Sequence, residues 1–385
     1  AFGNTDSIPI FIEKDYKISF SADFISGDPS FNTFWGLQGT TQLLFSDVMG
    51  DHKIYLLANL LLDLKNSNFY AAYLYQPEII DYMIAGYHSA GYVYYGYDSL
   101  GNNLLYRFRN FGVDLSASYP LDVFNRIEWG ISFKNASKEN VYNTSEPSIS
   151  RFLIIPEGRY VHDDVLYGIF SPIIGQRYYI GFMGTPKFSE NNIGFLSINA
   201  DYRKYFQISD LTSIAIRGAV GMSFGPNPQN FYLGGTDYWI NSFFAFDRIP
   251  LNTPEDFAFL NSSFIMPLRG FAVGQITGNR FFLANLEFRF PFIGWLLATP
   301  IPIAQAFMAG VFFDIGGAWS GDWTSFKSTR IDNQGKTVPN NLLMSSGVGL
   351  RTGLLGIPVK LDIAWANYYY KWSEPKYLFS LGFDF

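Results

Sequence analysis

The amino-acid sequence predicts an all-β fold: a 16-stranded antiparallel transmembrane β-barrel with a long loop inserted into its lumen. Three observations lead to this prediction. Apolar and polar residues alternate along many segments of about ten residues, a length that crosses the hydrocarbon layer as a tilted strand. Phe, Tyr and Trp are frequent near the segment ends, as membrane interfaces favour. Short and long connections alternate along the chain, which is typical of outer-membrane barrels.

The alternation is clearest in two segments. In the C-terminal segment, Tyr377 and Phe379 lie on one face, and Lys376 and Asp384 on the other; residues 194–205 alternate in the same way. Successive side chains of a strand point to opposite faces, so each segment has one apolar face and one polar face. A soluble half-buried sheet gives the same alternation. Strand length, aromatic placement and connection lengths favour the membrane barrel.

The strands are expected in a regular order along the chain. They lie near residues 16–24, 35–46, 53–63, 68–76, 81–95, 103–118, 123–134, 163–170, 176–186, 193–205, 211–223, 280–290, 304–315, 343–353, 357–366 and 376–385. Short turns are expected at residues 47–52, 77–80, 118–122, 171–175, 206–210 and 354–356, and longer loops at 135–162, 224–279 and 316–342. Because lipid tolerates no open sheet edge, the last strand is expected to pair with the first.

The ends of the chain follow from this count. An even number of strands places both termini on one side, and short turns belong on the periplasmic side. Residues 1–15 are therefore expected to form a short periplasmic lead, and residues 16–385 the barrel, with the lumen loop at 224–279. We expect an integral protein of a bacterial outer membrane with both termini in the periplasm.

Composition excludes several classes of protein. The 385 residues include 27 Lys and Arg against 33 Asp and Glu, a formal charge of −6, without any basic run, which argues against nucleic acid as a partner. There is no cysteine, hence no disulfide framework and no thiolate metal site. The apolar run at residues 290–313 contains Pro291, Pro300 and Pro302, so it is interpreted as two strands and a turn rather than a spanning helix.

Catalytic motifs are weak. Residues 221–225 match the G-x-S-x-G pattern around Ser223, but Pro226 and Pro228 follow where a helix is needed, and no His occurs beyond His162. His162 with Asp163 and Asp164 could hold a metal, although a lone His in this setting is more often hydrated. We therefore expect no enzyme, no metal and no cofactor.

The loop at residues 224–279 stands apart. It is far longer than an ordinary connection, and loops of this length are usually functional or disordered. Its many Phe residues argue against simple disorder. A barrel of this size has a wide lumen, so an aromatic loop could fold inward and plug it.

Several motifs in the second half resemble those of the BamA/TamA superfamily, whose outer-membrane barrels insert or translocate proteins. In order they are Gly168 to Gly175, Gly234 with Gly235, Leu268-Arg269-Gly270-Phe271, Leu286-Glu287-Phe288, Phe312 to Trp319, Ser346 to Arg351, and the terminal Phe385, which is similar to the family's assembly signal. The resemblance covers roughly residues 160–385. The first half agrees only in its strand rhythm.

The resemblance implies a set of site residues. The long loop would enter the lumen, and Arg269 would pair with the inward-facing acids Glu287 and Asp314. The alternation independently places Glu287 on the polar face, and a charge on the lipid face would cost about 2–4 kcal/mol near mid-bilayer. The hypothesis is that Arg269 holds the loop in the lumen. A second hypothesis concerns Gly382 in the last strand, where the barrel would open sideways along the seam with the first strand, since glycine weakens strand pairing.

The resemblance also implies a function, namely protein insertion or translocation, or assembly of an envelope component. The barrel would contact outer-membrane lipid, including lipopolysaccharide. Family members carry periplasmic POTRA domains before the barrel, and residues 1–15 are too few for one. Either the module is missing, and other envelope proteins supply it, or the barrel belongs to a longer chain. The alternatives are a passive pore or structural protein, and a hydrolase that uses Ser223.

Overall fold

The computed structural model describes residues 16–32, 36–59, 67–97, 101, 103–143, 145–168, 171–188, 192–241, 263–297, 307–354 and 357–382. Almost all of the regular structure is β-strand. The strands of the wall are β1 (Phe20–Asn32), β2 (Gly36–Asp47), β3 (His52–Asn59), β4 (Asn68–Tyr75), β5 (Asp81–Tyr97), β6 (Asn103–Pro120), β7 (Asn125–Asn140), β8 (Ile149–Asp163), β9 (Leu166–Tyr167), β10 (Pro172–Thr185), β11 (Phe195–Ser209), β12 (Thr212–Phe224), β16 (Arg280–Pro291), β17 (Met308–Trp319), β20 (Leu342–Leu354), β21 (Ile357–Asn367) and β22 (Lys376–Leu381).

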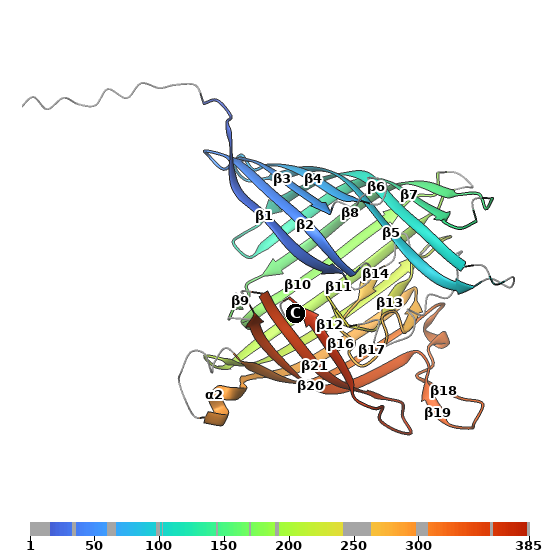
Figure 1. Cartoon of the computed structure of the whole chain (residues 1–385). Helices are drawn as coiled ribbons and strands as arrows, with labels where there is room; N and C mark the ends of the chain where they lie inside the picture. Colours follow the sequence, from blue (N-terminus) through green and yellow to red (C-terminus); the bar gives the residue numbers. More distant parts are fainter. Residues whose placement is uncertain are drawn as a thin grey trace, which may run out of the picture.

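These strands form one antiparallel sheet that curls into a barrel (Figure 1). The sheet has 17 strands in the described residues. Because β9 has only two residues, sixteen longer strands remain, the number that the sequence predicts. Each long strand pairs with its neighbours along the wall, for example β5 with β6 over the register Asp81↔Ser118 to Tyr97↔Asn103. Strands β1 and β22 are the edges, and in the described residues β1 pairs with β2 and β22 with β21. The backbone pairing expected between the first and last strands is not found there.

The two faces of the wall have opposite chemistry. In β12, Ile216 and Val220 are exposed, whereas Ala215, Arg217 and Ala219 are buried. A soluble sheet would turn its aliphatic side chains inward. Here the exposed face is the apolar one, as lipid requires, and the buried face encloses a polar lumen.

One region of the wall differs from the prediction. The prediction of a loop at residues 135–162 is wrong, because β7 continues to Asn140 and β8 occupies Ile149–Asp163. The strand expected at 163–170 is reduced to the two residues of β9. The sequence pattern misled here because charged residues, as around Lys138 in β7, and a proline, as Pro156 in β8, are both typical of loops. Pro156 lies just past the end of the register that β8 shares with β10.

The connection from β16 to β17 is also longer than a tight turn. It contains the short helix α2 (Phe292–Leu297), and β17 begins at Met308, four residues later than expected. Within the described residues, no helix has the length and apolarity that a membrane-spanning helix needs. The expected lead, residues 1–15, lies outside the described residues.

The long connection from β12 to β16 turns into the barrel. Its strands β13 (Phe231–Leu233), β14 (Ser263–Ile265) and β15 (Ile276–Gly278) form a separate small sheet. In Figure 1, β13 and β14 lie between the β1–β8 half of the wall and the half formed by β16–β22. Apolar side chains join loop and wall in one buried cluster: Phe231, Leu233, Leu268 and Phe271 from the loop, and Ala219, Phe281, Leu283, Ala318, Leu343 and Ala366 from the wall. The lumen loop is therefore a packed element.

Candidate functional site

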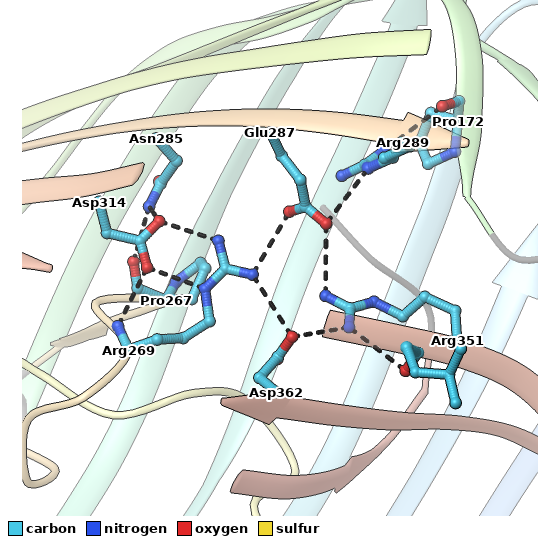
Figure 2. Close-up of polar contacts among 10 residues, drawn as sticks. Pro172, Pro267, Arg269, Asn285, Glu287, Arg289, Asp314, Arg351 and Asp362 are labelled. Atoms are coloured by element: carbon cyan, nitrogen blue, oxygen red, sulfur yellow. Dashed lines mark hydrogen bonds and ion pairs between the residues drawn. The ribbon is translucent and has the colours of Figure 1, made fainter. Parts of the chain in front are cut away.

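The candidate site is centred on Arg269 of the lumen loop (Figure 2). Two parallel bonds join its guanidinium to Asp314 of β17: Nε donates to Oδ2 over 2.8 Å, and Nη2 donates to Oδ1 over 2.9 Å. The backbone N–H of Arg269 donates to the same carboxylate over 3.1 Å. Its Nη1 donates to Glu287 Oε2 of β16 over 3.4 Å. The structure thus brings together the three residues that the resemblance groups.

The side chains of this cluster are buried. The relative exposure is 2% for Arg269, 1% for Glu287 and 0% for Asp314. The ring of Phe312 lies under the guanidinium, 3.4 Å from its central carbon, in a cation–π arrangement. Bidentate, charge-assisted bonds are strong and geometrically specific, and burial keeps them from being screened by salt.

Further charged side chains, which neither the alternation nor the resemblance singles out, complete the network. Arg351 of β20 donates to Asp362 of β21 over 2.7 Å and to Glu287 over 3.3 Å. Arg289 of β16 lies 3.6 Å from Glu287 and donates to the carbonyl of Pro172 in β10 over 3.4 Å. Asp362 also lies 3.9 Å from Arg269. Three arginines thus face three carboxylates, and the network is electrically balanced.

A sequence signal for these residues did exist. Arg351 ends the Ser346 to Arg351 segment that resembles the superfamily, and Asp362 shares the polar face of its strand with Lys360. Every charge on an inward face near the loop is a candidate partner of Arg269. Alternation identifies the face, but it does not tell which of these charges meet.

Two more wall residues hold the loop by its backbone. Asn285 of β16 donates through Nδ2 to the carbonyl of Pro267 over 2.9 Å and to Asp314 over 2.8 Å. Arg217 of β12 donates to the carbonyl of Met266, while its Nη2 pairs with Asp201 over 2.6 Å. Met266, Pro267 and Arg269 of the loop are therefore bound to the wall, from strands β12, β16 and β17.

The glycines of the loop have specific backbone roles. Gly234, Gly235 and Gly270 have φ of +130°, +84° and +85°, a region that disfavours side chains. Gly235 and Leu268 exchange both backbone bonds, Gly235 N–H to Leu268 O over 3.1 Å and Leu268 N–H to Gly235 O over 2.9 Å. The glycine pair is thus joined directly to the residue before Arg269.

The remaining predicted residues lie elsewhere. Gly382, with φ of +90°, follows the last residue of β22, and its N–H donates to Pro358 O over 2.9 Å. Phe385 lies outside the described residues. Ser223 is buried, and its hydroxyl accepts from Ser197 over 2.8 Å and from the N–H of Gln229 over 2.9 Å.

The carboxylates of the site are all held in ion pairs. The carboxylates of Asp314, Glu287 and Asp362 are all engaged by arginines. His162 contacts Asn125 over 2.7 Å and Asp164 over 3.5 Å, far along the chain from Ser223. Within the described part of the chain, no cluster of three or more His, Cys, Asp or Glu side chains could hold a metal. The arrangement is suited to holding a segment of polypeptide in place.

Replacing Arg217 by alanine should loosen the loop to a moderate extent. The loop loses one charge-assisted bond, worth about 1.5–3 kcal/mol, while Asp201 keeps its ion pair with Arg203 over 2.8 Å. The measurement is the rate of limited proteolysis within residues 224–279. Arg177→Ala is the matched control, since Arg177 of β10 pairs with Asp163, the last residue of β8. Equal rates in the two variants would remove Arg217 from the anchor.

Comparisons with known proteins identify the family and the fold. Residues 66–385 match the Omp85 superfamily domain. A search of curated proteins found no match. Among solved structures, BamA from Haemophilus ducreyi lacking POTRA domains 1–3 is 16% identical, with a TM-score of 0.59 over 96% of this chain and 70% of that one.

Two further structures share the fold. CdiB from Escherichia coli is 13% identical, with a TM-score of 0.53 over 97% of this chain. CdiB from Acinetobacter baumannii is 14% identical, with a TM-score of 0.51 over 93% of this chain. The chain spans 64% and 59% of the length of these two proteins. With the domain match over most of its length, its barrel wall and its inward-folded loop, the chain belongs to the Omp85 superfamily, a family of outer-membrane β-barrels.

Proposed function

We propose that this outer-membrane barrel inserts or translocates proteins, or assembles an envelope component. The observation that carries the proposal is the buried anchor of the lumen loop, in which Arg269 is joined to Asp314 and Glu287. Passive diffusion of solutes needs an open bore, which a large ordered plug narrows. A barrel that inserts or translocates proteins needs a bore that stays closed while no polypeptide is passing. The superfamily match supports the same function.

The surroundings of the barrel follow from the proposal. The exposed apolar face would contact outer-membrane lipid that includes lipopolysaccharide, and both termini would lie in the periplasm. Aromatic residues on this face, such as Tyr82 and Trp129, fit an interfacial position. A periplasmic module that receives clients would be supplied by other envelope proteins or by a longer form of the chain.

Depletion of the protein in its native host tests the proposed function. We expect a defined set of outer-membrane or surface proteins to fall in abundance, and wild-type protein supplied in trans to restore them. The measurement is the quantitative proteome of isolated outer membranes, with total protein as the reference. An unchanged proteome together with reduced uptake of small solutes would instead identify a passive pore.

A further inference from the structure

The outer edge of β22, the side that faces away from β21, lies outside the ion network around Arg269. Residues Lys376, Leu378 and Ser380 lie in register with β21, opposite Ala364, Asp362 and Lys360. Antiparallel strands alternate the direction of their backbone groups, so Tyr377, Phe379 and Leu381 direct N–H and C=O groups away from β21. In a closed barrel this edge would pair with β1.

A segment of the lumen loop occupies this edge instead. Ile240 N–H donates to Phe379 O over 2.8 Å, and Leu381 N–H donates to Tyr238 O over 3.3 Å. The side chain of Asn241 makes two further bonds: its Oδ1 accepts from Phe379 N–H over 2.9 Å, and its Nδ2 donates to Tyr377 O over 2.8 Å. We call residues 238–241 the edge cap.

The edge cap is held by side chains as well as by backbone. Trp239 has 0% relative exposure and pairs with Ser380 as an antiparallel bridge. It belongs to a buried cluster with Met266, Val273, Phe312, Ala364 and Leu378. Its indole N–H donates to Asn241 Oδ1 over 2.6 Å. The cap is therefore packed against β22, and the side-chain amide of Asn241 makes the hydrogen bonds that the backbone of a neighbouring strand would make.

The cap is also coupled to the anchor. Phe312 lies under the guanidinium of Arg269 and packs in the same cluster as Trp239. Gly235, three residues before Tyr238, is bonded to Leu268, the residue before Arg269. The loop thus holds the cap against β22 through the same residues that hold the loop in the lumen.

We propose that the edge cap is an internal competitor of β1 for the outer edge of β22. Phe379 N–H and Leu381 N–H are donated to the cap, and Tyr377 O and Phe379 O accept from it. The two N–H groups have no second hydrogen to donate, and the cap fills the position along the edge that a second strand would need. Capping of β22 and closure of the β1–β22 seam over Tyr377–Leu381 therefore exclude one another, whatever the barrel transports. An unpaired edge attracts strands, so β1 is the partner that β22 accepts once the cap leaves.

A disulfide tests whether the cap lies on β22 in the folded protein. The chain has no cysteine, so introduced thiols have no competitors. Because Trp239 lies opposite Ser380, Tyr238 lies opposite Leu381, at a separation within the reach of a disulfide. Tyr238→Cys with Leu381→Cys should cross-link under mild oxidation. Tyr238→Cys with Leu361→Cys is the matched control, since Leu361 lies one strand further away, opposite Phe379.

Competition is tested by photo-crosslinking from position 377, whose side chain is exposed. A benzophenone side chain in place of Tyr377 should gain cross-links to β1 in Asn241→Ala, because two cap bonds are lost. Two bonds of ordinary strength would shift the capping equilibrium by about tenfold or more. The disulfide lock should abolish these cross-links. Asn340→Ala is the control: Asn340 makes similar bonds within the loop between β17 and β20.

The outcomes separate cleanly. Heat-modifiable mobility on gels confirms that each variant is a folded barrel. Failure of the 238–381 disulfide in folded protein would overturn the cap, and equal cross-linking to β1 in the locked, wild-type and Asn241→Ala proteins would overturn the competition. Neither result depends on which proteins the barrel handles, so the proposed function is tested separately.

Discussion

Replacing Arg269 by alanine should release the lumen loop and open the bore. The substitution leaves Asp314 and Glu287 buried without their main cation, and breaking such a pair typically costs about 3–5 kcal/mol. The barrel wall keeps its own backbone pairing, so the cost should appear as local opening of the loop rather than global unfolding. We expect faster proteolysis within residues 224–279 and a higher single-channel conductance in planar bilayers.

Two companion variants make this result specific. Arg269→Lys keeps the charge but loses the planar fork that binds Asp314 at two points, so its effect should lie between wild type and alanine. Arg330→Ala removes an exposed arginine of the β18 hairpin (Thr329–Ile331) and should change neither quantity. Wild-type proteolysis and conductance in Arg269→Ala would refute the anchoring role.

Gly234→Ala should release the same loop through a steric route. At this residue φ is +130°, and an added Cβ would lie 2.0 Å from the carbonyl oxygen of Ala272. The unfavourable backbone conformation alone costs about 1–3 kcal/mol, and the clash adds to it because backbone atoms must move. The bonds between Gly235 and Leu268 should weaken, which shifts Arg269 away from its carboxylates. Proteolysis within the loop should approach the rate of Arg269→Ala.

The control for this variant is another glycine of the same region. Gly218 in β12 has nothing within 4 Å of an added Cβ, and its φ lies outside the left-handed region. Gly218→Ala should therefore leave loop proteolysis unchanged. Combining Gly234→Ala with Arg269→Ala should add little, since residues that act as one unit are not additive. Full additivity would mean that the glycine turn and the arginine anchor act independently.

The ion network that anchors the loop fixes the position of the loop more than it adds to stability. Replacing a buried ion network by apolar residues is often neutral or stabilising, so such networks are weak evidence for stability as such. The apolar cluster around Leu268 and Phe271 already provides packing. Three arginines and three carboxylates add orientation, because each fork accepts its partner in few geometries. The loop can thus occupy one defined position in the lumen.

Much of the wall was predictable from sequence because its signal is local. Each strand faces lipid on one side and the lumen on the other, so alternation repeats every two residues wherever the chain crosses the membrane. The number of long strands follows from this rule. The inward loop was expected from its length and its Phe content instead. It failed at residues 135–162, where β7 and β8 carry a polar or proline-containing sequence.

The site itself was only partly accessible. Inward faces and the resemblance pointed to Arg269, Glu287 and Asp314, which the structure joins. Arg351 and Asp362 lie on later strands, and their contact with this group depends on strand registers that alternation does not encode.

The sequence by itself thus determined which faces meet lipid and how many strands form the wall. Its resemblance to the superfamily indicated which arginine of the long loop pairs with acids. Only the tertiary structure decided that β20 and β21 complete the ion network and that residues 238–241 lie along β22. The reason is physical. Facing lipid or water is a property of each residue in its own strand, whereas a contact between residues more than 130 positions apart, such as Asn241 with Tyr377, depends on how the whole chain closes around its lumen.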